Sequence, residues 1–234
     1  MNMKLLEACT ISGLFTGSAQ ARWPGKPASA INKSAVQHPR MLTLTGFEGD
    51  QQADLKVHGG PDKAVHHYAA EHYANWQAEG LIPPGTRPAA FGENISTTGL
   101  TEHNVCIGDI FRLGEALVQV SQGRQPCWKL NAHTGQDQMA FLFQKTLRTG
   151  WYYRVLETGM VACGDDVTLA ERPHPQWSVA RVTHARLNQQ AAKRDANELA
   201  SLEALAPGWR KAFAMIAERG LKEDTSKRLD APGS

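Results

Sequence analysis

The sequence predicts a mainly β domain that is followed by a small helical extension. Between residues 14 and 169 the chain consists of short β-like runs separated by Gly, Pro, Asn and Asp, and long helical patterns are few. Residues 171–175 form a stiff, proline-rich boundary, after which three short helical patterns follow. A length of 234 residues, with 41% hydrophobic and 21% charged residues, suits one sizeable core with a small appendage.

Five β-like runs favour a barrel or a sandwich. The turn at residues 114–115 indicates a hairpin, and the Gly-Asp pairs at 108–109 and 164–165 indicate corners of a curved sheet. Two intervals with helical spacing of apolar residues, 65–79 and 138–149, interrupt these runs. The candidate strands are 41–44, 106–113, 116–121, 152–156 and 160–169.

The extension divides into three predicted helices. The first begins at Ser178, and the second begins at Asp195, whose carboxylate is placed to cap the helix while Glu198 reaches back. The third follows Pro207 and ends at Gly220. We therefore expect a β domain over residues 1–172, a three-helix domain over 173–222 and a disordered polar tail over 223–234.

Composition narrows the class of protein. The first 15 residues contain neither a signal-peptide core nor a membrane span, so we expect a cytoplasmic protein without a membrane partner. A formal net charge of +2 gives no general electrostatic reason to bind nucleic acid. The four cysteines are scattered without a CxxC pair, which argues against disulfides and against a tetrathiolate zinc site.

A glycine-rich turn with basic and imidazole side chains spans residues 58–68. Gly59 and Gly60 allow backbone amides to approach an anion, and Lys63 lies where the following predicted helix begins and its N–H groups favour negative charge. This pattern predicts a phosphate-binding turn. A plain strand-to-helix turn with solvated side chains is the alternative. The histidines of this segment do not reproduce the spacing of a zincin helix.

A second loop, residues 123–130, surrounds Cys127 with positive charge. Pro126 restrains the backbone immediately before the cysteine, and Arg124 and Lys129 favour the thiolate over the thiol. A thiolate attacks electrophiles or binds a soft metal, so we favour a functional role for Cys127. A small, buried, hydrophobic cysteine is the alternative. The polar loop 91–97, taken alone, is typical of a turn.

These motifs together resemble the MOSC family, the domain named for the carboxyl end of molybdenum cofactor sulfurase. The resemblance covers nearly the whole chain and rests on "VHGGPDKAVHHY", "FGENIS", "GRQPCWKL", "GWYYRVLETG" and "GDDVTL", in that order. It implies a MOSC-type β-barrel that binds molybdenum cofactor (Mo-molybdopterin), with the Cys127 thiolate as a ligand of the metal. It also implies an oxidoreductase that converts N-hydroxylated compounds, such as hydroxylamino-purine base analogues, to amines as a detoxification.

Within this hypothesis the other site residues have supporting roles. His58 and His67 are the candidate proton donors, because imidazoles titrate near neutral pH. A separate reductase has to supply electrons, since the sequence contains neither a GxGxxG fingerprint nor a cysteine set for an iron–sulfur cluster. The cofactor-binding candidates are Gly59, Gly60, Lys63 and Arg124 for the phosphate, and Asn94 and Ser96 for the polar edges of the pterin.

Two other classes of function stay open. The sequence also leaves open whether the protein forms a homodimer. The chain could carry or deliver molybdenum cofactor or sulfur without catalysing a reduction. It could also be a cofactor-free enzyme in which Cys127 is the nucleophile and His58 or His67 is the base.

Overall fold

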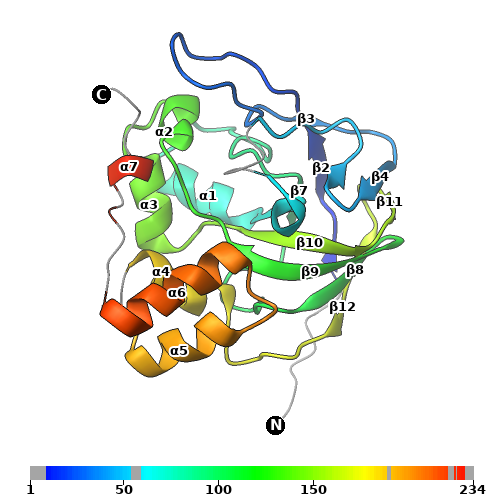
Figure 1. Ribbon diagram of the computed structural model, residues 1–234. Coiled ribbons are helices and arrows are strands. Elements are labelled where there is room, and N and C mark those ends of the chain that lie inside the picture. The colour runs from blue at the N-terminus through cyan, green and yellow to red at the C-terminus, as the bar shows by residue number, and fades with distance from the viewer. Residues whose placement is uncertain (1–8, 54–58, 189–190, 221–223, 225, 230–234) are drawn as a thin grey trace.

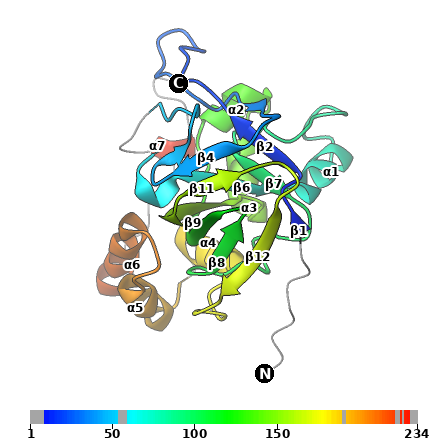
Figure 2. The same ribbon diagram turned by 90° about the vertical axis from the view of Figure 1, so that its right-hand side faces the viewer.

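The computed structural model describes residues 9–53, 59–188, 191–220, 224 and 226–229. A nine-stranded mixed sheet has the order β1-β12-β8-β9-β10-β6-β7-β2-β3, and a three-stranded sheet has the order β11-β4-β5. Figure 1 and Figure 2 show β9, β8 and β12 of the larger sheet side by side. The strands are β1 (Cys9–Thr10), β2 (Gly13–Thr16), β3 (Ser34–Ala35), β4 (Arg40–Thr43), β5 (Gly46–Phe47), β6 (Val65–Ala69), β7 (Ile95–Thr97), β8 (Ile110–Leu113), β9 (Ala116–Gly123), β10 (Trp151–Glu157), β11 (Gly159–Val161) and β12 (Asp166–Glu171).

The nine-stranded sheet curls until two distant strands reach the same stretch of chain. Strand β1 pairs with β12, and β2 pairs with β7. Because only two residues separate β1 from β2, the strands β12 and β7 both border residues 9–16. The sheet thus wraps around a core whose large side chains, such as Phe111, Trp151 and Tyr153, are fully buried. The prediction of a mainly β fold with few helices is confirmed, and the curled sheet has a barrel-like form.

Most of the predicted strands exist with shifted limits. Strands β8 and β9 form the predicted hairpin around residues 114–115. The predicted strand 106–113 shortens to β8, because Cys106 N donates to Asp109 Oδ2 (2.8 Å) in a turn before it. The predicted strand 160–169 splits into β11 and β12, because Gly164 turns the chain with a φ of 94°.

The prediction of one helix over residues 65–79 is wrong for its first half. Residues Val65–Ala69 form β6, between β10 and β7, and a helix, α1 (Glu71–Ala78), begins only after it. All five residues of β6 are buried, and pairing on both sides outweighs the helical spacing of its side chains. A short 3-10 turn, η1 (Pro61–Lys63), precedes β6, so no α-helix follows the Gly59-Gly60 turn.

Helices α1, α2 (Lys129–Thr134) and α3 (Met139–Thr146) cover one side of the sheet, and α3 matches the predicted interval 138–149. They close a second core that is rich in aromatic side chains. Tyr68 of β6 stacks on Phe143 of α3 with ring centroids 5.5 Å apart, and Trp76 of α1 also stacks on Phe143. Strand β6 is therefore buried on both faces.

Helices α4 (Val179–Leu187), α5 (Lys193–Ser201) and α6 (Pro207–Arg219) form the predicted three-helix extension. Ser178 caps α4, because its hydroxyl accepts a hydrogen bond from Arg181 N (3.2 Å). The prediction that Asp195 caps α5 is wrong: α5 begins before it, and its carboxylate pairs with Arg181 instead. Glu198 accepts a hydrogen bond from Trp177 Nε1 (2.8 Å) rather than reaching back.

The extension packs against the end of β9 that leads to Cys127. Ala206 N donates to Ser121 O (2.9 Å), and a Cβ on Gly123 would lie 2.2 Å from Thr183 Oγ1. Beyond α6, a further turn of helix, α7 (Ser226–Leu229), lies beside α2 and α3 (Figure 1), so this stretch of the predicted disordered tail is ordered. Among the helices of the described residues, none has the length and apolar character needed to cross a membrane.

Candidate functional site

A cleft opens where loops from four parts of the chain meet β6. Its empty volume, which includes the open solvent at its mouth, is about 610 Å³. It also contains Lys33 and Asp50, which lie outside every motif, and His66, which lies in the first motif but was not predicted as a site residue. Four of the sequence-predicted residues line it: Lys63, Asn94, Arg124 and Cys127.

Cys127 lies on the loop between β9 and α2. Arg124 N donates to Gly150 O (3.0 Å) where β9 ends, and Leu130 N donates to Cys127 O (2.9 Å) as α2 begins. The Cys127 side chain is half-buried. All four cysteines belong to the described residues and none forms a disulfide, so the sulfur of Cys127 is a thiol at the cleft.

Asn94 joins three segments at the cleft. Its Oδ1 accepts from His66 N (3.0 Å), and its Nδ2 donates to Asp50 Oδ2 (2.8 Å). Gly92 has a φ of 77°, and a Cβ there would lie 2.8 Å from Ile31, so this loop requires glycine. The Asn94 amide therefore lines the cleft and also holds it together.

A buried ion pair between Lys33 and Asp50 lines the cleft. Lys33 Nζ contacts Asp50 Oδ1, which also accepts from Gly17 N (2.7 Å). Burial lowers the pKa of Lys33 below its ordinary value, although Asp50 opposes that shift. A lysine with a lowered pKa gives up its proton more readily than a solvated lysine, which suits it to donate a proton to a bound reactant.

Three further cationic side chains, Lys63, Arg124 and Lys129, line the cleft. Arg124 NH1 donates to Phe91 O (2.6 Å), and Lys129 Nζ donates to a main-chain carbonyl (3.0 Å), which fixes both side chains. Among the described residues that line the cleft, Asp50 is the single carboxylate. The resulting positive field suits an anionic group such as a phosphate.

The Gly59-Gly60 turn does not line the cleft. Gly60 N donates to Gln52 Oε1 (3.3 Å), and Gln52 Nε2 donates to Lys63 O (3.3 Å), so the Gln52 side chain spans the turn. Because η1 rather than an α-helix follows, the helix-dipole argument for a phosphate at this turn fails. His58 lies outside the described residues.

The adjacent histidines of β6 lie on opposite faces of the strand. His66 lines the cleft beside Tyr152, with ring centroids 5.0 Å apart. His67 is fully buried away from the cleft, with its ring nitrogens hydrogen-bonded to Tyr153 OH (3.0 Å) and Thr97 Oγ1 (2.8 Å). Burial lowers the pKa of His67 to about 3 and that of His66 well below its ordinary value. Both rings are neutral at pH 7, which argues against the proton-donor role expected for His67.

Ser96 also lies away from the cleft. Its hydroxyl donates to Tyr68 O (3.0 Å) across the pairing of β6 with β7. The alternation of side chains along a strand is the signal that separates His66 from His67, and it becomes visible once residues 65–69 are recognised as a strand. Lys33 and Asp50 carry no comparable signal, because two separate loops bring them together.

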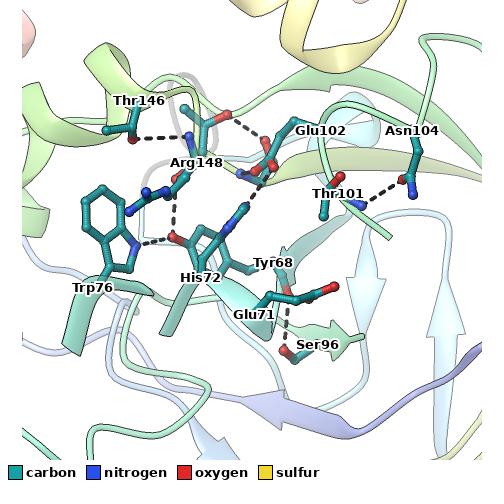
Figure 3. A network of polar contacts seen from close by, with 12 residues as sticks. Tyr68, Glu71, His72, Trp76, Ser96, Thr101, Glu102, Asn104, Thr146 and Arg148 are labelled. Atoms are coloured by element: carbon teal, nitrogen blue, oxygen red, sulfur yellow. Dashed lines mark hydrogen bonds and ion pairs between the residues drawn. The ribbon is translucent and has the colours of Figure 1, made fainter. Parts of the chain in front are cut away.

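Figure 3 shows a second group of polar residues, which includes the buried Glu102 and His72. Glu102 pairs with His72 Nε2 (2.8 Å) and accepts a hydrogen bond from Gly150 N (2.6 Å). Since Gly150 O accepts from Arg124 N, Gly150 connects this group to the cleft. Within the described residues, no three His, Cys, Asp or Glu side chains gather as a metal site. Tyr68 and Trp76 also belong to the group: Trp76 Nε1 donates to Tyr68 OH, which donates to the main-chain carbonyl of Arg148.

Known proteins share this architecture over nearly its whole length. A family model described as MOSC domain matches residues 54–168, and one described as YiiM-like, 3-alpha helix domain matches residues 177–214. Protein YiiM of Escherichia coli (strain K12) is 44% identical over 225 residues, which cover 92% of this chain and 96% of that protein. A crystal structure of YiiM from Escherichia coli has a TM-score of 0.77 and 35% identity, and the match covers 95% of this chain and 98% of that one.

A longer relative carries the same kind of domain within a larger chain. A protein named "Reductase" from Gibberella moniliformis (strain M3125 / FGSC 7600) is 42% identical over 160 residues, which make up 68% of this chain and 28% of that protein. From the family matches and the whole-length relative, the chain belongs to the MOSC domain family and carries a YiiM-like 3-alpha helix domain as its carboxyl-terminal extension.

Proposed function

We propose that this protein uses molybdenum cofactor, held in the cleft, to reduce N-hydroxylated compounds such as hydroxylamino-purine bases to amines. The observation that carries the proposal is the position of Cys127, whose thiol shares a cleft with four cationic side chains and one carboxylate. Membership in the MOSC family and the name of the fungal relative add support.

The residues of the cleft fit molybdopterin in kind. A Cys127 thiolate is a soft, strongly donating ligand for molybdenum, and Lys63, Arg124 and Lys129 suit a phosphate. The rings of His66 and Tyr152, tilted by 35° to each other, provide aromatic side chains for contact with a pterin or a purine. When bound, the cofactor supplies the two-electron redox chemistry, and the protein binds and orients the reactants.

Reduction of R–NH–OH to R–NH₂ consumes two electrons and two protons and releases one water. We assign one proton to Lys33, because it lines the cleft with a lowered pKa while His66 and His67 are neutral at pH 7. Asp50 holds the Lys33 ammonium in place through their ion pair. Lys33→Arg keeps the charge but donates protons poorly, so we expect a rate roughly 100-fold lower with the cofactor retained. An unchanged rate contradicts this assignment.

The two electrons are assigned to a separate reductase. The fungal relative supports this part of the proposal, because a stretch similar to this chain makes up 28% of a longer protein named "Reductase". A donor domain in the same polypeptide or a separate donor protein can both serve a barrel that has no flavin fingerprint of its own.

Turnover of a hydroxylamino-purine with a reduced viologen as electron donor tests the proposal. Protein made in cells that synthesise the cofactor should yield the aminopurine, Cys127→Ser should not, and the exposed-cysteine control Cys163→Ser should behave as wild type. Bound pterin without turnover indicates a carrier instead. Turnover that survives removal of molybdenum indicates a cofactor-free cysteine enzyme.

A further inference from the structure

Arg228 of α7 contacts the chain on both sides of Cys127. Its guanidinium NH1 donates to the carbonyl of Pro126, the residue before the cysteine. Its main-chain carbonyl accepts from the N–H of Trp128, the residue after the cysteine (3.0 Å). One residue near the carboxyl end thus brackets the proposed metal ligand, although 102 positions separate it from Pro126.

The other contacts of α7 attach it to the helices that cover the sheet, which are called the helical layer below. Arg228 NH2 donates to Gln144 Oε1 (2.9 Å) on α3, and Gln144 Nε2 donates to Leu187 O (3.0 Å) at the end of α4. Leu229 packs against the aromatic core, and its carbonyl accepts from Asn131 Nδ2 on α2 (3.5 Å). The turn is therefore attached to the β domain through α2 and α3, and through Gln144 to the three-helix extension.

The loop that carries Cys127 lacks the regular backbone hydrogen bonds of a strand or helix, so the contacts with Arg228 restrain it. The pairing of β9 with β10 ends at Gly123, and helix α2 begins at Lys129, so residues 124–128 lie between two regular elements. Pro126 has no N–H to donate, which leaves its carbonyl as its backbone hydrogen-bonding group. A cation-bearing side chain that binds this carbonyl restrains the backbone one residue from the thiol.

We infer that Arg228 is a positioning residue that straps the Cys127 loop to the helical layer. The effect of these contacts on catalysis rests on the proposed function, whereas the contacts of Arg228 with Pro126 and Trp128 (the strap) do not. The three-helix extension then has a structural consequence for the site, because it leads the chain to a point from which α7 reaches the loop.

Hydrogen exchange of the Trp128 amide and the alkylation rate of the Cys127 thiol test the strap in the full chain without cofactor. Arg228→Ala should accelerate Trp128 exchange roughly tenfold, since a hydrogen bond to a charged group is lost and the turn loosens. It should also change the alkylation rate of Cys127 several-fold. Arg228→Lys can still reach one acceptor and should give intermediate values. Arg219→Ala, an exposed arginine at the end of α6, is the matched control.

The inference is overturned if the exchange rate of the Trp128 amide and the alkylation rate of Cys127 are the same in Arg228→Ala, Arg219→Ala and wild type. If Arg228→Ala does not fold, Arg228→Lys tests the inference. Wild-type exchange and alkylation rates in that variant contradict a role for the two hydrogen bonds of the guanidinium, to Pro126 O and Gln144 Oε1. Molybdenum content measured on the same samples separates this inference from the proposed function. Wild-type protein without the metal refutes the proposed function and leaves the exchange result to decide the strap.

Discussion

Two groups of buried polar residues meet at Gly150, and they differ in what surrounds them. In the group around Glu102, each strong hydrogen-bonding pair closes within the protein, as between Glu102 and His72 (Figure 3). In the cleft, the cationic side chains and Cys127 surround an empty volume of about 610 Å³. Buried charged side chains are common to both groups, and the open volume next to a thiol is the feature that makes the cleft the candidate site.

The difference predicts two kinds of variant. Changes in the group around Glu102 should lower the stability of the fold, because a buried donor or charge loses its partner. Changes at the cleft that leave buried pairs intact should spare stability and alter binding. Gly150 belongs to both groups and should show the largest effect.

Gly150→Ala tests the residue that the Glu102 group and the cleft share. The φ of Gly150 is 71°, and a Cβ there would lie 2.3 Å from His67 O. Gly135 has nearly the same φ, 72°, with no atom within 4 Å of its Cβ position. Urea unfolding should show a loss of about 4 kcal/mol for Gly150→Ala and about 1 kcal/mol for Gly135→Ala. Equal losses contradict the packing described for Gly150.

Glu102→Ala tests the closed group itself. It leaves Gly150 N without its acceptor and His72 without its partner, so we expect a loss of about 3 kcal/mol in the free energy of unfolding. The control Glu79→Ala removes a solvent-exposed pair with Arg148 and should lower stability by less than about 1 kcal/mol. Similar losses for both variants mean that the Glu102 group is not a closed buried network.

The pH dependence of stability tests the burial of His67. Its pKa is about 3 in the folded protein and about 6.5 in an unfolded chain. The unfolded chain therefore binds the extra proton, and stability is full above pH 6.5 and falls as the pH drops towards 3. The slope for this one histidine is about 1.4 kcal/mol per pH unit. Unfolding measured from pH 6 to 4 should be less steep by this amount in His67→Gln, and an unchanged slope refutes the burial.

Lys63→Gln should have the smallest effect on stability and a clear effect on binding. The half-buried Lys63 side chain lines the cleft, so we expect a change in unfolding free energy within about 0.5 kcal/mol. If Lys63 contacts the cofactor phosphate, the dissociation constant for the pterin rises roughly tenfold. Fluorescence of pterin retained after gel filtration measures it. If Lys63→Gln retains as much pterin as wild type, Lys63 does not contact the cofactor phosphate.

The sequence predicted the elements that depend on local chemistry. Turn residues marked the hairpin at 114–115, Ser178 marked the start of α4, and Gly220 marked the end of α6. The segment 65–69 was harder, because its spacing fits a helix while pairing with β10 and β7 makes it a strand. The same strand places His66 at the cleft and His67 away from it, whereas the sequence predicted His67 at the site.

The candidate site was predictable where one loop carries its own signal. Cys127 stands out through Pro126 and the nearby cations, and the cleft contains it together with Arg124. Lys33 and Asp50 could not be paired from sequence, since their contact depends on how two loops fold against β6. Arg228 could not be connected to Pro126 for the same reason, because the contact is purely tertiary.

Molybdenum and pterin content is the most direct test of the central claim, that Cys127 holds molybdenum cofactor in the cleft. The samples are wild type, Cys127→Ser and Cys163→Ser, all made in cells that synthesise the cofactor. We predict that wild type and Cys163→Ser carry both metal and pterin and that Cys127→Ser loses the metal. Folded wild-type protein that carries neither, or a Cys127→Ser variant that keeps as much metal as wild type, contradicts the claim.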